Sequence, residues 1–420
     1  MNIGRLIFFH RKRRGMTQAQ LADGVCSVSH LSKIENNSKE MSEETQSLLF
    51  KKLNIKLYEE EHRINTLKKD IHLLHKEIIH QNKSKSQEIF LNISKVADWI
   101  EFTPYIFLYK IVIFRFYLFL NNISEAKAVR EQLSKQKNKL SNDEKILFML
   151  CTSIYLLMKN KLQRSLDLLI SVEKLSGHNP PIELNYYFSL LYGRLNKFSL
   201  SMLYGNKALL EFQNSNNYLR VIDTQMILAI DLKQVGAMNE SLDLFLKAGE
   251  MTDLVQDINR IAKIFHNIGD LYYWNNNYEE ASYYFTKSIE NKEYGTEDYI
   301  KTLSGLAEVH MLLGEKEKAK DLVVQTLKLS QQKNLSVNVT LFTIYSIQLE
   351  NNFQKLYSYL ESYAIPFFIE KNRWHLVSKY GEIIASYHAD KQDYKKANEY
   401  LTLCNQALQN QYNNERIPLP

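Results

Sequence analysis

Polar side chains that can hydrogen-bond to nucleic acid are gathered near the N-terminus. Ser29, His30 and Lys33 are spaced so that they share one face of a helix. Gln18 and Ser27 stand where two helices are expected to begin, and the free backbone N–H groups at helix N-termini favour phosphates. Side chains of these types supply the donors and acceptors that base edges and phosphates bind. The pattern therefore predicts contact with double-stranded DNA.

Two short helices must position these side chains. Thr17 and Gln20 form a capping-box pattern, so a helix should begin after Thr17 and end at Gly24. Ser27 is a favourable cap for a second helix, the candidate recognition helix. The opposite face of this second helix is expected to be buried and holds Val28, Leu31 and Ile34.

Two helices of this length cannot bury a core alone, so neighbouring helices must complete the domain. A preceding amphipathic helix should end near Gly15, and Ser42 can cap a following helix. The following helix carries the apolar residues Leu48, Leu49 and Leu53. Residues 1–56 are thus predicted to form a compact helical domain that binds DNA.

The excess positive charge of the chain is concentrated in this domain. Residues 1–56 contain ten Lys and Arg and five Asp and Glu, a net charge of +5, whereas the whole 420-residue chain carries +6. Binding to a phosphate backbone requires such a concentration, because each neutralised phosphate releases counterions. The alternative interpretation is a solvated basic face that contacts another protein.

The domain resembles the lambda-repressor and Cro-like helix-turn-helix family. That family pairs an Arg, four residues before the first turn glycine, with a Glu late in the recognition helix. Arg11 and Glu35 occupy these positions, so the resemblance implies a structural ion pair between them. Asn37 stands where the family usually has Gly, and Asn is the next best residue in the left-handed conformation.

The fold class predicted for the whole chain is all-α. Gly and Pro are scarce, with 13 and 6 residues, and no long stretch alternates apolar and polar residues. The most apolar run, residues 105–120, is interrupted by Lys110 and Arg115 and is shorter than the roughly 20 residues that cross a bilayer, so a buried helix is expected. Three distant cysteines and the lack of a secretory signal pattern favour a cytoplasmic protein that does not enter the membrane.

Residues 57–99 are predicted to form a linker helix and the first helices of a solenoid. Apolar residues recur there at alternating spacings of three and four, namely Ile64, Leu67, Ile71, Leu74 and Ile78. One interpretation is a dimer contact or a rigid lever. The other, which the small number of heptads favours, is a helix that packs on the next one in the body.

A repeat runs through residues 100–412. Its clearest copy places Gly269, Tyr272, Ala281 and Phe285 at offsets of three, twelve and sixteen, and the third positions of most copies are 36 to 40 residues apart. Small residues let two helices approach closely while large ones fill the space between them. The pattern resembles the tetratricopeptide repeat, with about eight units followed by a tail at 413–420. The resemblance implies a right-handed solenoid whose first helices line a concave, peptide-binding face.

Helix geometry then identifies the residues of that concave face, because they lie opposite the buried stripe of each first helix. An Asn amide can bond to a peptide unit, cations can bind the peptide carboxylate, and acids can hold its N-terminal or basic end. The candidate peptide-binding residues are Asn267, Arg220, Asp223, Lys263, Asp270, Tyr187, Arg194 and Lys301. The alternative is an ordinary solvated helix face. The sequence contains no Gly-rich phosphate loop, nucleophile motif or metal-ligand cluster, so no catalytic residue, metal or cofactor is predicted and an enzyme is the less favoured class.

Taken together, the helix-turn-helix run Gly24 to Asn36, the repeats and the length resemble the peptide-pheromone-responsive regulators of Gram-positive bacteria, the group of Rap, NprR, PlcR and PrgX, and most of all the NprR type. The resemblance implies a cytoplasmic homodimer whose DNA binding is switched by a short signalling peptide. We expect the dimer contacts in the terminal repeats, around residues 373–400, with the 64–78 seam as a further candidate. The alternative function is a Rap-like adaptor that acts on a response regulator of the sporulation phosphorelay.

Overall fold

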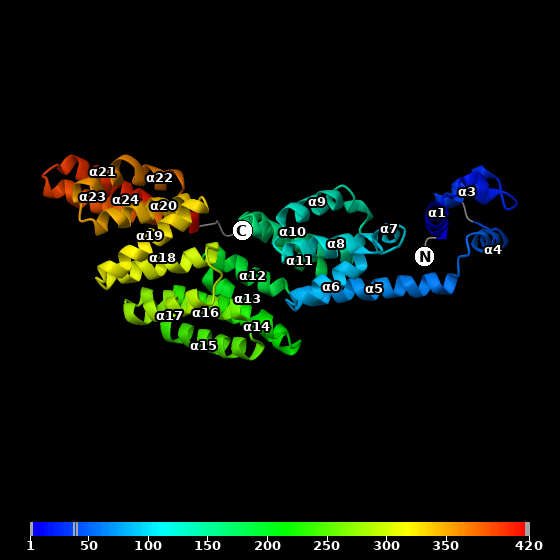
Figure 1. Ribbon diagram of the computed structural model, residues 1–420, viewed down its shortest axis with the longest axis horizontal. Coiled ribbons are helices and arrows are strands. Elements are labelled where there is room, and N and C mark those ends of the chain that lie inside the picture. Colours follow the sequence, from blue (N-terminus) through cyan, green and yellow to red (C-terminus); the bar gives the residue numbers. More distant parts are fainter. Residues whose placement is uncertain (1–2, 37, 39–40, 416–420) are drawn as a thin grey trace. The chain divides into compact units, whose positions relative to one another are not determined.

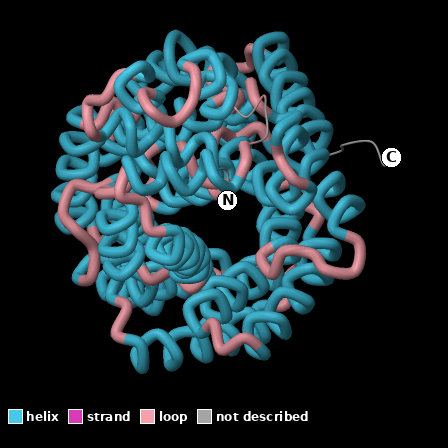
Figure 2. Tube along the Cα trace, turned by 90° about the vertical axis from the view of Figure 1, so that its right-hand side faces the viewer, coloured by secondary structure: helices cyan, strands magenta, loops and turns pink. Residues whose placement is uncertain are grey.

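The structure is a computed structural model that describes residues 3–36, 38 and 41–415. Helices account for all the regular structure of these residues, and no strand occurs among them (Figure 2). The all-α prediction is confirmed. The chain divides into two compact units, residues 1–194 with 203–221 and residues 195–202 with 222–420. No helix in the described ranges has both the length and the apolar character needed to cross a membrane.

The first unit opens with a small domain of four helices, here called the head. They are α1 (Ile3–Arg13), α2 (Gln18–Ala22), α3 (Val28–Glu35) and α4 (Glu43–Lys52). The capping box of Thr17 and Gln20 is present, and Ser27 and Ser42 cap α3 and α4 as predicted. The core of the head is built mainly from Leu6, Ile7, Leu21, Leu31, Ile34, Leu49 and Leu53.

Two residues expected in this core are exposed. Val28 is 45% exposed because it is the first residue of α3 and precedes the turn that Leu31 buries, and Leu48 is 41% exposed because Leu49 takes the buried face of α4. Asn37 and the last residues of the predicted C-terminal tail lie outside the described residues.

The long helix α5 (Leu57–Ile79) leaves the head and pairs with α6 (Lys83–Ser94), before the short α7 (Ala97–Ile100). The apolar seam of α5 is buried in one cluster with residues of α6, α7 and α8, including Ile93, Trp99 and Phe116. The packing interpretation of this seam is therefore confirmed. Because these side chains are covered within the chain, the seam is not available as a dimer contact.

Paired helices continue through the first unit (Figure 1). They are α8 (Ile106–Phe119) with α9 (Ile123–Ser134), α10 (Asn142–Met158) with α11 (Leu162–Ser176), and α12 (Leu184–Arg194) with α13 (Phe198–Asn214), and a 3₁₀ turn at Lys137–Lys139 precedes α10. The apolar run expected as a buried helix is α8, which buries the residues from Ile111 to Phe116.

The second unit repeats the same pairing, except that α14 up to Val221 belongs to the first unit and α13 up to Met202 belongs to the second. Its pairs are α14 (Tyr218–Gln234) with α15 (Met238–Val255), α16 (Ile258–Trp274) with α17 (Tyr278–Glu290), α18 (Glu297–Leu312) with α19 (Lys316–Gln332), α20 (Ser336–Leu349) with α21 and α22 (Phe353–Tyr359 and Ile365–Glu370), and α23 (Trp374–Asp390) with α24 (Tyr394–Glu415). A π-helical turn, Leu360–Ala364, joins α21 to α22 just before Pro366, whose ring cannot continue a regular α-helix.

Small residues set the distance between paired helices. A Cβ atom added to Gly269 would lie 2.7 Å from Cδ1 of Phe285, and one added to Gly305 would lie 2.9 Å from its Cζ. The ring of Phe285 therefore fills the space between α16 and α18 only because both positions lack a side chain. In the first unit, the hydroxyl groups of Ser153 and Ser165 meet at 2.8 Å across the equivalent helix pair.

A common turn joins the two helices of each pair. In the described chain nine pairs have a three-residue linker whose middle residue has a positive φ: Gln81, Asn121, Asn160, Asn196, Gly236, Asn276, Gly314, Asn351 and Gln392. Asn and Gly tolerate this conformation best. In the pair α16 and α17, the N–H of Asn277 donates to the carbonyl of Tyr272 at 2.9 Å, which satisfies a free carbonyl at the helix end.

Candidate DNA and peptide interfaces

The exposed face of α3 carries the side chains predicted to contact DNA. Ser29 and Lys33 are exposed and His30 is half-buried, whereas Leu31 and Ile34 point into the core of the head. The cap at Ser27 fixes the start of this helix, because its Oγ accepts from the backbone N–H of His30 at 3.2 Å. The face can therefore present donors and acceptors to a partner in the order that the sequence predicts.

A buried ion pair holds α3 in place. The Arg11 guanidinium donates from Nε to Oε1 of Glu35 at 2.6 Å and from Nη2 to Oε2 at 2.8 Å, and both side chains are almost fully buried. Gln18 adds a donation from Nε2 to Oε2 of Glu35 at 2.8 Å. Three helices of the head thus share one carboxylate. The side-chain amide of Gln18 is used in this network, so a phosphate at the start of α2 would meet mainly its backbone N–H groups.

Lys52 is a structural residue of the head that the sequence did not single out. Its Nζ donates to the carbonyls of Gln20 at 3.0 Å and Asp23 at 2.6 Å, which closes the C-terminal end of α2. The contact joins residues about thirty positions apart, and no local pattern indicates it.

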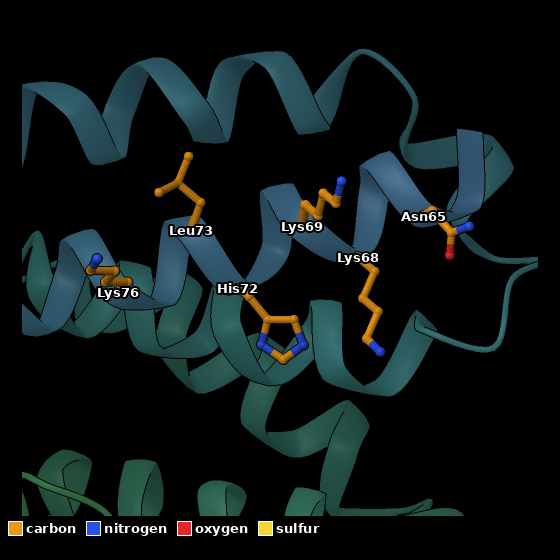
Figure 3. Close-up of a pocket in the computed structure, with 6 residues that line it drawn as sticks. All are labelled: Asn65, Lys68, Lys69, His72, Leu73 and Lys76. Atoms are coloured by element: carbon orange, nitrogen blue, oxygen red, sulfur yellow. The ribbon is translucent and has the colours of Figure 1, made fainter. Parts of the chain in front are cut away.

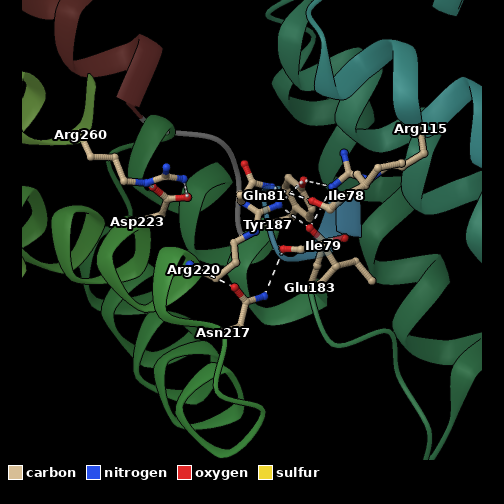
Figure 4. Close-up of polar contacts among 10 residues, drawn as sticks. All are labelled: Ile78, Ile79, Gln81, Arg115, Glu183, Tyr187, Asn217, Arg220, Asp223 and Arg260. Carbon is tan, nitrogen blue, oxygen red and sulfur yellow. Dashed lines mark hydrogen bonds and ion pairs between the residues drawn. The ribbon is translucent and has the colours of Figure 1, made fainter. Parts of the chain in front are cut away.

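In the first unit, a buried group of charges joins three helices of the solenoid. We call Arg115, Glu183, Tyr187 and Arg220 the arginine cluster (Figure 4). Arg115 donates from Nη2 to Oε1 of Glu183 at 2.8 Å and to the hydroxyl of Tyr187 at 2.7 Å, and Arg220 also donates to Glu183. All four residues are at most 6% exposed.

The charges within the arginine cluster compensate one another. Burial alone raises the pKa of the Glu183 carboxyl, but the charges of Arg115 and Arg220 outweigh burial and hold that pKa below its usual value. His75 of α5 lies close to the cluster, and burial lowers the pKa of its imidazole to about 4, with a smaller contribution in the same direction from Arg115. At neutral pH the cluster therefore combines charged arginines and a carboxylate with a neutral histidine.

The structure corrects the placement of Tyr187 and Arg220, which were expected on an exposed peptide-binding stripe. Both are buried, because the 37-residue spacing between Glu183 and Arg220 brings their side chains together across neighbouring first helices. Arg194 is exposed and donates to the carbonyl of Leu157 at 3.4 Å. Nearby, Asn217 donates from Nδ2 to the carbonyl of Ile79 at 3.1 Å, at the C-terminal end of α5.

Two of the predicted acids, both in the second unit, are also occupied. Asp223 of α14 accepts two hydrogen bonds from Arg260 of α16, at 2.8 and 3.0 Å, and Arg260 is held by Asp257 as well. Asp270 of α16 is paired with Lys233 of α14. Neither acid is an uncompensated anion for a peptide N-terminus, because each is bound to a cation of the neighbouring first helix.

Between these two ion pairs, α16 presents Lys263 and Asn267. Lys263 is exposed, and Asn267 is half-buried with no hydrogen bond from its amide to any other described residue. Lys301 of α18 is exposed as well. These three predicted residues therefore keep polar groups available to a ligand.

Lys292, in the segment between α17 and α18, completes a group of positive charges with Lys263 and Lys301. We call these three residues the lysine cluster. Nζ of Lys292 donates to the carbonyl of Asp298 at 3.0 Å and to Oγ1 of Thr302 at 2.5 Å, and Oγ1 of Thr302 lies 3.0 Å from Nδ1 of His266. Among the described residues, none of the three lysines forms an ion pair.

Burial and mutual repulsion both act on the charges of the lysine cluster. Burial lowers the pKa of Lys292 to about 8, opposed by Asp298 and reinforced by Lys301 and Lys263. Burial also lowers the pKa of His266 to about 3, and Lys301 and Lys292 act in the same direction. An anion placed here would relieve this repulsion. Sequence reasoning missed Lys292 because it lies in a linker outside the helical stripes.

Known proteins resemble both the head and the solenoid of this chain. Residues 10–59 match the helix-turn-helix family HTH_3. The chain is 23% identical to the transcriptional activator NprA of Geobacillus stearothermophilus, over 94% of this chain and all of that protein. In structure it is similar to the apo form of the quorum sensor NprR from B. thuringiensis, with 19% identity, a TM-score of 0.72, and coverage of 82% of this chain and 99% of that one.

A second solved structure, NprR in complex with its cognate peptide NprX, is 20% identical, with a TM-score of 0.63 and coverage of 82% of this chain and 99% of that one. Both solved structures share the helical solenoid fold, and NprA is matched over its whole length by 94% of this chain. The chain therefore has an N-terminal domain that matches the helix-turn-helix family, followed by a tetratricopeptide-like solenoid with the fold of the NprR structures.

Proposed function

We propose that the chain is a cytoplasmic transcription regulator that binds double-stranded DNA through α3 and is switched by a short signalling peptide. The match to the helix-turn-helix family and the similarity to the transcriptional activator NprA support the first part. The shared fold with an NprR that binds the peptide NprX supports the second. No enzymatic family is indicated by these relatives.

The observation that carries the peptide site is the combination of Asn267 with the lysine cluster. An extended peptide leaves backbone donors and acceptors unpaired when it loses water, and a half-buried amide such as that of Asn267 can satisfy a donor and an acceptor of one peptide unit. The peptide carboxylate then lies against Lys263, Lys292 and Lys301, which lack a counter-ion among the described residues. Arg220 and Tyr187 are buried in the arginine cluster of the first unit, so they are left out of the proposed peptide site.

The active form in this proposal is a homodimer. One head is large enough to contact only one half-site, and two-fold symmetric operators require two heads about a helical turn or more apart. The terminal pair α23 and α24 remains the proposed contact. Sedimentation of the full chain with peptide and operator tests it, and a monomer under those conditions contradicts it.

Calorimetry tests the peptide site, with a synthetic copy of a short peptide that is encoded next to the gene as the ligand. The same peptide amidated at its C-terminus is the second ligand. We expect Asn267→Ala and Lys301→Gln to weaken binding of the free-carboxyl peptide at least tenfold, and amidation to remove most of the effect of Lys301→Gln. Lys320→Gln, an exposed lysine on the second helix of the same pair, is the matched control. Parental affinity in both site variants would place the peptide elsewhere.

Operator binding tests the DNA face. The test variant is the full chain with Ser29→Ala and Lys33→Ala. If these side chains read bases, operator binding should weaken by about 1–3 kcal/mol for each base. If they neutralise phosphates, the salt slope of binding should become smaller by about one for each phosphate. Unchanged affinity and slope would reject this face. If the double variant no longer binds DNA but keeps its full cellular effect, the adaptor acting on a response regulator is the better function.

A further inference from the structure

A pocket of about 550 Å³ lies where the head meets the first helices of the solenoid. The two parts touch through His10, whose Nε2 is 3.1 Å from Oε1 of Glu60, and through the rings of Phe9 and Phe102, whose centroids are 5.3 Å apart. The pocket is bounded on one side by the end of α1 and on the other by α5 and the segment around α7. Its size is in the range of sites for small ligands.

Four cationic side chains line this pocket, two from each part. Lys12 and Arg13 come from α1, Arg63 comes from α5, and Lys95 precedes α7. The guanidinium of Arg63 lies over the ring of the buried Trp99, with its carbon 4.1 Å from the ring centroid. Stacking fixes the plane of the guanidinium and leaves its N–H edge directed away from the ring, which is the edge that binds oxyanions.

The positive charges of this pocket have no ion-pair partner among the described residues, although Nζ of Lys95 donates to Oδ1 of Asn92 at 3.0 Å. Two carboxylates, Asp98 and Glu101, also line it, yet no ion pair is formed by any of the four cations with a described residue. Burial lowers the pKa of Arg63, and the charge of Arg13 acts in the same direction although Glu60 opposes it. Cations of the head and of the solenoid therefore repel each other across the pocket.

We propose that this pocket is a binding site for a small phosphate-bearing anion that bridges the head and the solenoid. Several cations around one cavity match the charge of a polyvalent oxyanion better than that of a single carboxylate, and the Arg63 edge can bind two oxygens of one phosphate group. The half-buried rings of Phe9 and Phe102 form an apolar wall beside the cations. A free polyphosphate uses the cations alone, whereas a nucleotide also places its base on that wall.

A neighbouring pocket supplies a matched control. It measures about 620 Å³ and is lined by residues of α5 alone, namely Asn65, Lys68, Lys69, His72, Leu73 and Lys76 (Figure 3). Its cations share the exposed face of one helix and have no stacked guanidinium beneath them. Lys69→Gln therefore removes one positive charge from α5 without touching the bridging pocket.

The experiment is calorimetric titration of the full chain with sodium pyrophosphate, and in parallel with ATP and adenosine, at low salt and without DNA or Mg²⁺. We expect saturable binding of pyrophosphate with one site per chain, weakened at least tenfold by Arg63→Gln and by Lys95→Gln and unchanged by Lys69→Gln. Tighter binding of ATP than of pyrophosphate, with none of adenosine, identifies a nucleotide. Equal binding identifies the phosphate alone.

Three results overturn the proposal. They are the absence of saturable binding, parental affinity in the Lys95→Gln variant, and equal losses in Lys69→Gln and Lys95→Gln, which would reveal a diffuse charge effect. Circular dichroism shows whether Arg63→Gln, which loses the stack on Trp99, still folds. If it does not, Lys95→Gln remains informative because Lys95 is exposed. If pyrophosphate does not bind but Arg63→Gln lowers the salt slope of operator binding by about one, the cations belong to the DNA footprint instead.

Discussion

The arginine cluster of the first unit and the lysine cluster of the second unit use similar charges in opposite ways. In the arginine cluster two guanidinium groups share the carboxylate of Glu183, and every member is buried. In the lysine cluster Lys263 and Lys301 are exposed and Lys292 is half-buried, and no carboxylate is paired with any of them among the described residues. A histidine with a lowered pKa lies beside each cluster.

The difference teaches how to separate structural charges from ligand-binding charges in a helical repeat. Buried charges must be paired, because an isolated ion in a medium of low polarity costs several kcal/mol. Partly exposed cations tolerate the absence of a partner, since water screens them, and they remain available to a ligand. Arg220 and Lys301 both lie on first helices, yet only Lys301 retains an exposed charge.

The largest expected effect comes from breaking the arginine cluster. Glu183→Gln leaves two buried guanidinium groups without their carboxylate, so the free energy of unfolding should fall by ~3–5 kcal/mol. Urea unfolding of the full chain measures this loss. Glu173→Gln, an exposed glutamate in the same unit, is the control and should change it by less than about 0.5 kcal/mol. Equal stability of the two variants would contradict the assignment of the cluster as structural.

A buried carboxylate of the second unit tests, on a negative charge, the same principle that a buried charge without a partner destabilises the fold. Asp231 of α14 is 1% exposed, and burial raises its pKa to about 6, partly offset by a hydrogen bond with Ser201. Because the folded-state pKa exceeds the unfolded one, the proton stabilises the fold fully below pH 4 and this contribution is lost as the pH rises through 6. Asp231→Asn should therefore stabilise the chain by ~1–3 kcal/mol at pH 8.

The same variant should show little gain at pH 4, where Asp231 is protonated in the folded state. Urea unfolding at the two pH values provides the measurement, and the pH dependence separates loss of the charge from any change in packing. A gain of equal size at both pH values would mean that the charge is not the cause.

A smaller effect is expected when the lysine cluster is neutralised. Lys301→Gln removes a repelling, exposed charge, so the free energy of unfolding should stay within ~0.5 kcal/mol of the parent. The urea midpoint of the variant in the absence of peptide measures this change. A loss comparable to that of Glu183→Gln would show that the lysine cluster, like the arginine cluster, holds the fold together.

The smallest effect is on the titration of His266. Its pKa is lowered to about 3 mainly by burial and next by Lys301, so Lys301→Gln should raise that pKa by less than one unit. The imidazole resonances followed by NMR against pH report the change. Lys320→Gln should leave the resonances unaltered, and an equal shift in that control would contradict a local effect of Lys301.

Local patterns in the sequence predicted much of the fold. The capping box at Thr17 and the cap at Ser27 involve residues three apart, and the small positions of the repeat follow from the size of the ring that they face, as at Gly269 and Phe285. One available signal was overlooked. Asn, Gln or Gly at the centre of the linker within each pair recurs every 36 to 41 residues from Gln81 to Gln392. Asn216, Asn334 and Asn372 hold the same place between pairs, so the residue marks helix ends rather than pairs.

The candidate sites were less predictable, because residues far apart in the chain decide whether each charge is already paired. Arg220 and Asp270 have the composition of a binding stripe, but Glu183 and Lys233, each 37 residues away, pair with them. Asn267 and Lys301 have no such partner in the part of the chain that the structure describes, and no pattern within one helix distinguishes the two cases. Lys292 lies in a linker, where helical periodicity has no meaning.

The placement of Phe285 between Gly269 and Gly305 has a consequence for cooperativity. A ring enclosed by glycines of successive pairs couples those pairs, so α16, α17 and α18 should open as a single unit. Their amide protons should then exchange with solvent more slowly than those at the ends of the solenoid. A peptide that binds along α16 and α18 would meet a preorganised surface, and little of its binding free energy would be lost in ordering the protein.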